Sequence, residues 1–318
     1  MSFPEKIVSN QDLADLVNTS DQWIRDRTGI VERRVVSNGQ ANSDLSVQAV
    51  RQALDQTPYS PGDIDLIIVA TVTPDMMFPS TACILQDKLG ARNAWGFDLS
   101  GACSGFVYAL ATGAQYIQNG VYEKVFVVGT DVMSTIINFE DRSTCVLFGD
   151  GSGAVLLEPS NDDSGILDFL LRSDGSGGKY LSMPAGGSLN PASHETVEKQ
   201  MHVVHQDGRM VFKFAVKLMT EVCQELLHRN HLGPEDIKLF IPHQANLRII
   251  NSAVERLGLK KDQVFINIDR YANTTAATIP VGLAEAQKEG RLQDGDLVLL
   301  ASFGAGFTWG GILLRWGC

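Results

Sequence analysis

The sequence predicts an α/β protein, a five-layer α/β/α/β/α sandwich built from two duplicated halves. Helical apolar periodicity alternates with continuous apolar strands, the same order of elements occurs twice, and a nearly constant offset separates the two copies. Continuous apolar strands separated by helices are typical of mostly parallel sheets that helices cover on both faces. Stacking two such sheets gives the five layers.

The first copy consists of a helix followed by three strands with a second helix between them. Val47, Val50 and Leu54 recur at helical spacing, and the turn TPYSPGD separates them from an apolar strand at 64–70. A strand at 95–99 leads into the helix SGACSGFVYALATGAQYI, which is rich in small residues, and a further strand follows in GVYEKVFVVGT.

The second copy repeats this order. Apolar residues at helical spacing over 212–227 precede the turn HLGPED and a strand at 237–241. A strand expected at 264–268 leads into the helix NTTAATIPVGLAEAQ, and the last strand lies in GRLQDGDLVLLAS. Ile64 and Ile237, at equivalent places in the two copies, are 173 positions apart. A regular offset of this kind indicates an internal duplication.

The duplication divides the chain into three parts. The N-terminal half covers 1–158 and carries a candidate nucleophilic cysteine, and the C-terminal half covers 209–318 and carries a candidate histidine and asparagine. Between them, 159–208 is rich in Gly, Ser and Asp and has few periodic positions. We expect this part to form inserted loops near a site or an interface.

Composition excludes several classes of partner. The net charge is −11, which argues against nucleic acid or an anionic membrane surface as the main partner. The apolar run at 64–70 is far shorter than the roughly 20 residues that span a bilayer. The N-terminal MSFPEKIVSNQDL has no apolar signal core, so we expect a cytoplasmic protein. The five cysteines lack CxxC or CxxH spacing, which favours reduced thiols and predicts no metal site.

Candidate functional residues follow the ends of the predicted strands. Cys103 comes four residues after one strand, His243 directly after another, and Asn273 five residues after a third. The glycine-rich loop that begins at Gly304 follows the last strand. Ligands of open α/β sheets gather beyond the carboxyl ends of the strands. The sequence therefore predicts that a thiol, an imidazole and an amide share one edge.

Cys103 has the setting of a nucleophile. It lies in Gly-Ala-Cys-Ser-Gly, where small neighbours permit a sharp turn from strand to helix. A helix N-terminus favours the thiolate, the form that attacks acyl groups. The alternative is a buried small apolar residue, which is the usual fate of a free cysteine. The other four cysteines lack this setting and are interpreted as structural: Cys83, Cys145, Cys223 and Cys318.

His243 and Asn273 each have a simpler explanation. An asparagine that opens a helix can be an N-cap, and a lone histidine can be a core residue. Placed beside Cys103, however, they suit acyl transfer from a thioester, with backbone N–H groups of the 304–306 loop stabilising the oxyanion. The imidazole and the amide would then stabilise the enolate that remains when a malonyl carboxylate departs as CO2. Such a reaction needs no cofactor.

Six segments carry a resemblance to a known family: TSDQWIRDRTGIVERR, DLSGACSGFVYAL, LFGDGSGAVLL, IPHQANLRII, YANTTAATIP and SFGAGFTWGG. Together they resemble β-ketoacyl-acyl-carrier-protein synthase III, the condensing enzyme that starts type II fatty-acid synthesis. The resemblance implies a thiolase-type fold, a homodimer, and a catalytic triad of Cys103, His243 and Asn273. It also implies a ping-pong reaction of acetyl-CoA, or another short acyl-CoA, with malonyl-acyl-carrier protein, in which acyl-CoA is a substrate.

The resemblance also implies further contacts. Trp23, Arg27 and Arg142 would bind the CoA adenine and phosphates, Phe78 would close the partner subunit's acyl pocket, and Phe303 would promote decarboxylation beside the cysteine. Gly304 and Ala305 belong to the loop that supports the oxyanion. A basic patch would receive the acidic carrier protein in spite of the negative net charge: Lys213, Arg248 and Arg256.

The sequence departs from the family's pattern at three positions. Ala272 stands in the family's common YGN, and Ala305 stands in its FGGGF loop, so each backbone must tolerate a Cβ. Glu255 stands where a basic residue often lies, which concerns the strength of carrier docking.

Three other functions compete with this interpretation. A thiol hydrolase of the α/β-hydrolase type shares the G-x-C-x-G turn but requires an acid to orient the histidine. A non-catalytic acyl-binding module derived from the synthase would usually have lost one of the three polar residues. An acyltransferase or a secondary-metabolite synthase of the same fold would differ only in the walls of its pocket.

Overall fold

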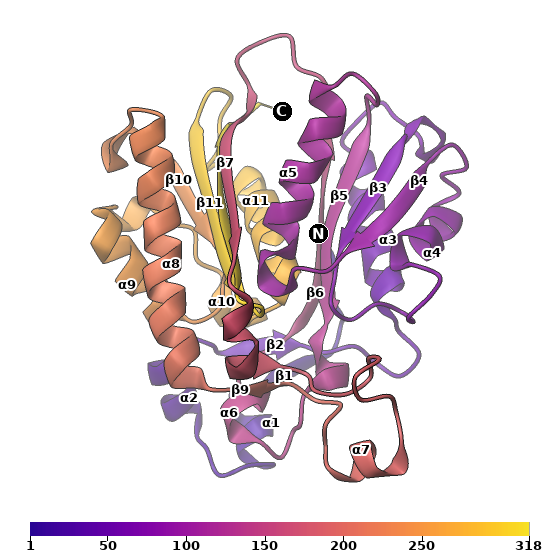
Figure 1. Cartoon of the computed structure of the whole chain (residues 1–318). Coiled ribbons are helices and arrows are strands. Elements are labelled where there is room, and N and C mark those ends of the chain that lie inside the picture. Colours follow the sequence, from indigo (N-terminus) through magenta and orange to yellow (C-terminus); the bar gives the residue numbers. More distant parts are fainter. Residues whose placement is uncertain (318) are drawn as a thin grey trace.

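The computed structural model describes residues 1–317 and has two four-stranded sheets at its centre (Figure 1). In the first sheet, β3 pairs in parallel with both β4 and β5, and β6 is antiparallel to β5. In the second, β10 is parallel to β11, followed by antiparallel β12 and β7. Their bounds are β3 Leu66–Ala70, β4 Trp95–Leu99, β5 Val125–Val132, β6 Asp150–Leu157, β7 Gly165–Ser173, β10 Leu239–Pro242, β11 Leu297–Gly304 and β12 Thr308–Arg315.

Helices cover both faces of each sheet. Two lie between the sheets, α5 (Gly105–Gln118) and α11 (Thr278–Lys288). The outer face of the first sheet packs against α3 (Asn42–Leu54) and α4 (Thr81–Leu89). The outer face of the second packs against α8 and α9, which span Gly208–Arg229 and Leu247–Leu257. The predicted five-layer sandwich is therefore confirmed.

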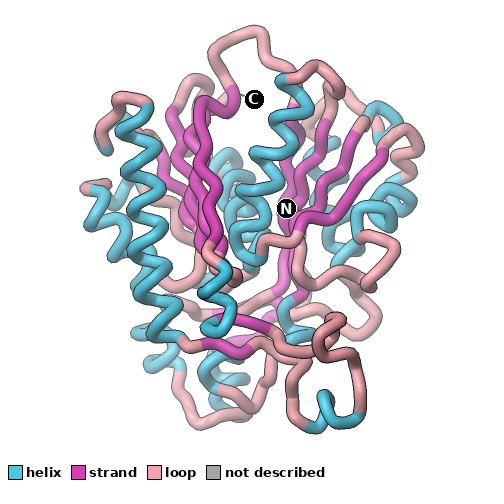
Figure 2. The backbone as a smooth tube through the Cα atoms, in the orientation of Figure 1, coloured by secondary structure: helices cyan, strands magenta, loops and turns pink. Residues whose placement is uncertain are grey.

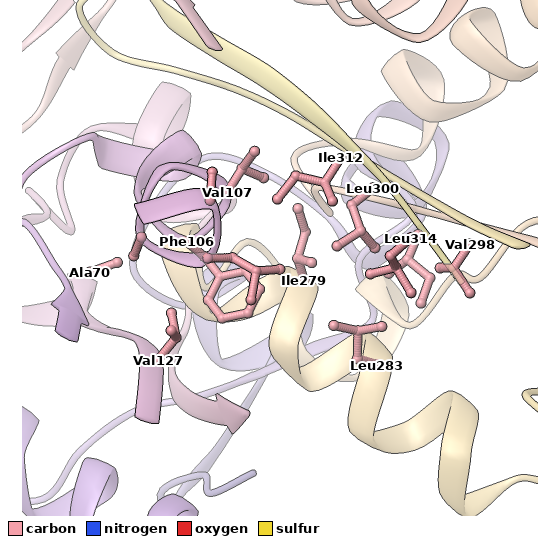
Figure 3. Close-up of a cluster of buried hydrophobic side chains, with 14 of the residues drawn as sticks. Ala70, Phe106, Val107, Val127, Ile279, Leu283, Val298, Leu300, Ile312 and Leu314 are labelled. Atoms are coloured by element: carbon pink, nitrogen blue, oxygen red, sulfur yellow. The ribbon is translucent and has the colours of Figure 1, made fainter. Parts of the chain in front are cut away.

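The largest apolar cluster lies between the two sheets. Phe106 of α5, Ile279 and Leu283 of α11, and Leu300 and Ile312 of the second sheet are buried there and point toward one another (Figure 3). Each such side chain contributes about 1.5–3 kcal/mol by leaving water. The central helices are therefore held from both sides, which fixes the segments at their N-terminal ends.

Short elements pack beneath the sandwich, at the end where the strands of the first sheet lead into α5 (Figure 2). A fully buried arginine, Arg33, joins several of them: its guanidinium donates to the carbonyl oxygens of Val8 and Val146 and to Oδ1 of Asn10. The elements are β1 Ile7–Ser9, α1 Asn10–Ala14, α2 Asp21–Thr28, β2 Glu32–Arg34, α6 Arg142–Cys145, β8 Leu181–Ser182, α7 His194–Glu198, β9 His205–Gln206 and α10 Ile268–Tyr271.

Two predictions about secondary structure were wrong. The segment 159–208, predicted as loops, contains β7, whose register against β12 shifts between Leu313 and Leu314. That irregularity disturbs the alternation of apolar residues by which a strand is recognised. The strand predicted at 264–268 reduces to a single bridge between Val264 and Phe240, and the helix α10 begins at Ile268.

Among residues 1–317, no helix is both long enough and apolar enough to cross a membrane.

Candidate active site

Cys103 lies in a 3₁₀ turn, η2 (Ala102–Ser104), between the end of β4 and the start of α5. Ala102 has a φ of 47°, so the chain turns sharply just before the cysteine. The Cys103 carbonyl accepts a hydrogen bond of 2.6 Å from the Ser302 hydroxyl on β11. The cysteine is 9% exposed. One half of the protein thus supplies the thiol, and a strand of the other half anchors it.

The glycine-rich loop after β11 lies directly against this turn. A Cβ at Gly304 would stand 2.8 Å from the backbone nitrogen of Cys103 and 3.1 Å from that of Ser104. Position 304 therefore excludes any side chain. In the described 304–307 loop, φ lies in the left-handed region only at Gly306, where it is 139°. The backbone at Ala305 thus tolerates its Cβ, although the family's pattern has glycine there.

His243 follows β10 and is anchored to the same strand as Cys103. Its backbone N–H donates to the carbonyl of Ala301, the neighbour of Ser302, at 2.8 Å. Its side chain is 1% exposed, with Nδ1 2.7 Å from the Thr278 hydroxyl. Nε2 has no hydrogen-bond partner among the described residues. A buried polar atom without a partner is costly, and such atoms are typical of sites that receive a ligand.

Asn273 lies in a loop between α10 and the 3₁₀ turn η7 (Thr275–Ala277). Its carbonyl accepts from Gly149, and its side-chain Oδ1 accepts from the Thr275 N–H at 2.9 Å. The second of these bonds determines which end of the amide faces the turn. The sequence predicted that Asn273 opens a helix, but α11 begins only at Thr278, because η7 intervenes.

The segments that carry Cys103 and His243 are both bonded to β11, and the segment that carries Asn273 contacts that of Cys103. Cys103 and His243 are bonded to the adjacent residues 302 and 301 of that strand, and η2 contacts η7, two residues after Asn273. The buried Asp131 on β5 holds η7 in place, because its carboxylate accepts from the Thr275 hydroxyl and the Ala276 N–H. Residues far apart in the sequence are thus gathered at one edge.

The expectation that Cys103 rests as a thiolate was wrong. Burial and, to a smaller extent, the charge of the nearby Asp131 raise the pKa of the Cys103 thiol to about 12. Cys103 lies in a short 3₁₀ turn, and among residues 1–317 no cation lowers its pKa to offset the loss of water. At neutral pH the group is a thiol. Its proton must therefore leave as the new bond to an acyl carbon forms.

Burial of His243 makes the protein sensitive to acid, because it lowers the pKa of the imidazole from 6.5 to about 3. Between pH 6.5 and pH 3, His243 is protonated in the unfolded chain but not in the folded protein. Stability is therefore lost as the pH falls from 6.5 toward 3, by about 1.4 kcal/mol for each unit of pKa difference. We expect His243→Gln to flatten the pH dependence of urea unfolding in this window. The exposed His228→Gln is the control, and an unchanged slope in His243→Gln would contradict the burial argument.

Ala272, the neighbour of Asn273, has φ 57° and ψ −155°, a conformation that is essentially reserved for glycine. We expect Ala272→Gly to raise the free energy of unfolding by about 1 kcal/mol. Glycine removes the backbone strain of the folded state, and this gain outweighs the greater conformational entropy that glycine gives to the unfolded chain. Urea denaturation measures this difference. Ala277→Gly, at an ordinary φ of −76°, should lose stability instead. Equal losses in both variants would show that Ala272 is not strained.

The residues expected to contact CoA come together on two helices. Trp23 of α2 lies near two exposed arginines, with the Arg142 guanidinium 4.7 Å and the Arg27 guanidinium 6.0 Å from the centre of its ring. Arg142 also donates to the carbonyl of Asn18, in the segment that precedes α2, at 2.9 Å. An aromatic ring flanked by cations suits a ligand that is both aromatic and anionic.

The residues expected to receive the carrier protein lie on neighbouring helices. Lys213 is exposed on α8, while Arg248 and Arg256 are exposed on α9. The Arg248 guanidinium lies 5.5 Å from the ring of Phe212, the neighbour of Lys213. Glu255 is also exposed beside Arg256, so a negative charge interrupts the positive surface.

The remaining predicted residues divide between core and surface. Phe303 is buried with its ring 4.8 Å from that of Phe307, whereas Phe78 is 85% exposed in this chain. Cys145 and Cys223 are buried, as a structural role requires. Cys83 is exposed on α4, where its sulfur accepts a hydrogen bond of 3.2 Å from the Ser80 hydroxyl. Cys318 lies outside the described residues.

Sequence reasoning missed three residues that support the site: Asp131, Thr278 and Ser302. Each makes its contact across a long sequence separation, so no local pattern marks it. The segment NTTAAT did contain an unusual run of hydroxyl groups before an apolar helix, and this was the one available signal. Within residues 1–317, no group of His, Cys, Asp or Glu side chains is arranged to hold a metal ion.

Comparison with known proteins identifies relatives that match nearly the whole chain. The family model "3-Oxoacyl-[acyl-carrier-protein (ACP)] synthase III" matches residues 97–175, and the model of that family's C-terminal part matches residues 227–316. The Beta-ketoacyl-[acyl-carrier-protein] synthase III of Solibacter usitatus (strain Ellin6076) is 55% identical over 316 residues, covering 98% of this chain and 96% of the relative.

Solved structures agree with these matches. The 3-oxoacyl-[acyl-carrier-protein] synthase III of Aquifex aeolicus VF5 has a TM-score of 0.92 and 44% identity, over 99% of this chain and 97% of that one. The corresponding enzyme of Thermus thermophilus has a TM-score of 0.91 and 43% identity, over the same shares. Fold and comparisons together define a thiolase-fold acyltransferase. Within that class, the chain belongs to the β-ketoacyl-[acyl-carrier-protein] synthase III family.

Proposed function

We propose that the protein condenses a short acyl-CoA, with acetyl-CoA as the first choice, with malonyl-acyl-carrier protein. The products are a 3-oxoacyl-carrier protein, CoA and CO2, and the reaction initiates fatty-acid synthesis. The observation that carries the proposal is the attachment of Cys103 and His243 to adjacent residues of β11, with the unpartnered Nε2 of His243 buried at the same edge.

The first half-reaction is transfer of the acyl group to Cys103. The sulfur attacks the thioester carbonyl of acyl-CoA, the carbon–sulfur bond to CoA breaks, and the thiol proton ends on the CoA sulfur, which leaves as free CoA. Backbone N–H groups of the turn at Cys103 and of the loop at Gly304 and Ala305 are the proposed oxyanion donors. The exclusion of a side chain at Gly304 supports this role, since it lets the loop approach the cysteine closely.

The second half-reaction is decarboxylation followed by carbon–carbon bond formation. The malonyl carboxylate leaves as CO2, and the electron pair becomes an enolate whose oxygen accepts hydrogen bonds from His243 and Asn273. The enolate carbon attacks the acyl group on Cys103, and the cysteine sulfur leaves and takes up a proton from solvent to restore the thiol. Because the pKa of His243 is lowered to about 3, its imidazole is neutral at working pH and acts as a hydrogen-bond donor without a full charge. Buried Phe303 would exclude water beside the cysteine.

The two substrates would dock on different surfaces. The pairing of Trp23 with Arg27 and Arg142 supports binding of the CoA adenine and phosphates. The exposed cations of α8 and α9 support binding of an acidic carrier protein: Lys213, Arg248 and Arg256. No cofactor enters the reaction, and we propose that it takes place in the cytoplasm.

We propose further that the protein acts as a homodimer. The strand β4 lies at the edge of the first sheet and is only half-buried, with Trp95 42% exposed. An apolar edge of this kind invites pairing with a second copy. The loop that carries Phe78 is exposed too, and in the dimer Phe78 would close the partner subunit's acyl pocket. Sedimentation velocity should give the mass of two chains, and a stable monomer would contradict the proposal.

The deciding experiment is incubation of the purified protein with a panel of acyl-CoAs and malonyl-acyl-carrier protein. We expect CoA, CO2 and 3-oxoacyl-carrier protein in equal amounts, with the highest rate for a short acyl chain. Release of free carboxylic acid without condensation would instead indicate a thiol hydrolase. Equal rates with malonyl-CoA and malonyl-carrier protein would argue against a carrier-docking surface.

A further inference from the structure

The imidazole of His243 is held by one hydroxyl group. Thr278, the first residue of α11, is 3% exposed, and its Oγ1 lies 2.7 Å from Nδ1 of His243. The same Oγ1 lies 3.1 Å from the carbonyl oxygen of Thr275. A threonine hydroxyl carries one proton, so it donates to only one of these two acceptors at a time.

The two distances indicate which acceptor receives the proton. Hydrogen bonds that a hydroxyl donates to oxygen cluster at about 2.7–2.8 Å, shorter than the roughly 2.9–3.0 Å of those that an N–H group donates to oxygen. The contact to Nδ1, at 2.7 Å, has the length of a bond that the hydroxyl donates. The contact to Thr275, at 3.1 Å, is long for a hydroxyl donor. The geometry therefore favours Thr278 donating to Nδ1.

A neutral imidazole that accepts at Nδ1 must carry its proton on Nε2. Nε2 is the buried atom that lacks a partner within the described chain. An N–H group at this place can donate to a carbonyl oxygen of a ligand, whereas a bare nitrogen would repel that oxygen. The enolate step requires the first arrangement.

We propose that Thr278 is a positioning residue that selects the Nε2–H form of His243 and so makes the imidazole a donor to the malonyl thioester. This inference rests on the proposed function for its consequence in catalysis, but the protonated nitrogen itself can be observed without any substrate. Transfer of the acyl group from acyl-CoA to Cys103 does not use this donor. The effect of Thr278 should therefore fall on one half-reaction.

The kinetic test compares Thr278→Val, which keeps the shape but removes the hydroxyl, with Thr278→Ser, which keeps the hydroxyl. We expect Thr278→Val to lower kcat for malonyl-carrier-protein decarboxylation by about tenfold or more, since a buried hydrogen bond is lost. Acyl loading, followed by mass spectrometry of the intact protein, should change less than about twofold. Thr278→Ser should restore decarboxylation. Equal loss in both half-reactions would reduce Thr278 to a structural residue and overturn the proposal.

The spectroscopic test uses ¹⁵N-histidine-labelled protein without substrate. The sequence has six histidines, and the spectrum of His243→Gln identifies the signals of His243 by their absence. We expect a protonated, pyrrole-type Nε2 and an unprotonated Nδ1 in the unsubstituted protein and in Thr278→Ser. A protonated Nδ1 in the unsubstituted protein would overturn the inference even if condensation occurs. If condensation fails while Nε2 carries the proton, the proposed function fails and the positioning role stands.

Discussion

Cys103→Ala should abolish acyl transfer to the protein, whereas His243→Ala and Asn273→Ala should still accept an acyl group from acyl-CoA. The latter two variants should fail at decarboxylation of malonyl-carrier protein. The reason is a division of labour: the sulfur makes the covalent bond, and the imidazole and amide stabilise an enolate that forms only in the second step. Removal of one oxyanion donor typically costs about 10²–10³ in kcat.

Mass spectrometry of the intact protein measures loading, and release of labelled CO2 measures decarboxylation. Cys83→Ala is the matched control, because Cys83 is also a free cysteine but is exposed and lies on α4. It should load and condense like the unsubstituted protein. Loss of loading in all three site variants would refute the division of labour, and loading of Cys103→Ala would refute the identity of the nucleophile.

Gly304→Ala should inactivate the enzyme with little change in its substrate surfaces. The added Cβ would stand 2.8 Å from the backbone nitrogen of Cys103, a distance at which backbone atoms must move. Either the turn at Cys103 or the loop after β11 then shifts, and a displacement of about 1 Å at a reacting group can cost about 10²-fold in rate. Both half-reactions should suffer, because the nucleophile and its oxyanion donors move together.

Ala305→Gly is the control for this prediction, since it removes a Cβ that the loop already tolerates. We expect its kcat to remain within about threefold of the unsubstituted value, because no group of the site loses a contact. Calorimetric unfolding should show that Gly304→Ala is still folded. Full activity in folded Gly304→Ala would mean that the loop and the cysteine are less closely coupled than their packing indicates.

The sequence predicts the layers of this fold well, because periodicity reports which face of each element is buried. The strands at 64–70 and 237–241 were recognised as uninterrupted apolar runs, and the structure places their equivalents at Leu66–Ala70 and Leu239–Pro242. The strand β7 was missed because its pairing is irregular. The expected strand at 264–268 was suggested by the duplication, yet the second copy makes only one bridge there.

The sequence says more about where the candidate site residues lie than about their ionisation. The rule about strand ends depends only on topology, and the prediction that Cys103, His243 and Asn273 share one edge rests on it. The structure shows Cys103 and His243 bonded to neighbouring residues of β11. The prediction that the helix N-terminus favours a Cys103 thiolate was wrong, because burial raises the pKa of the thiol. Residues of the other half of the chain, such as Ser302, pack against the cysteine, and local sequence does not reveal them. For the same reason the partner of His243, Thr278, could not be identified from spacing.

The strand β11 fixes the spacing between one attachment point of the first half and one of the second. Cys103 belongs to the first half and His243 to the second, yet both are bonded to consecutive positions, Ser302 and Ala301, whose Cα atoms are about 3.8 Å apart in any trans peptide. While both hydrogen bonds hold, β11 sets the spacing of these two attachments. On heating, we therefore expect activity to be lost together with β11 and not with the outer helices.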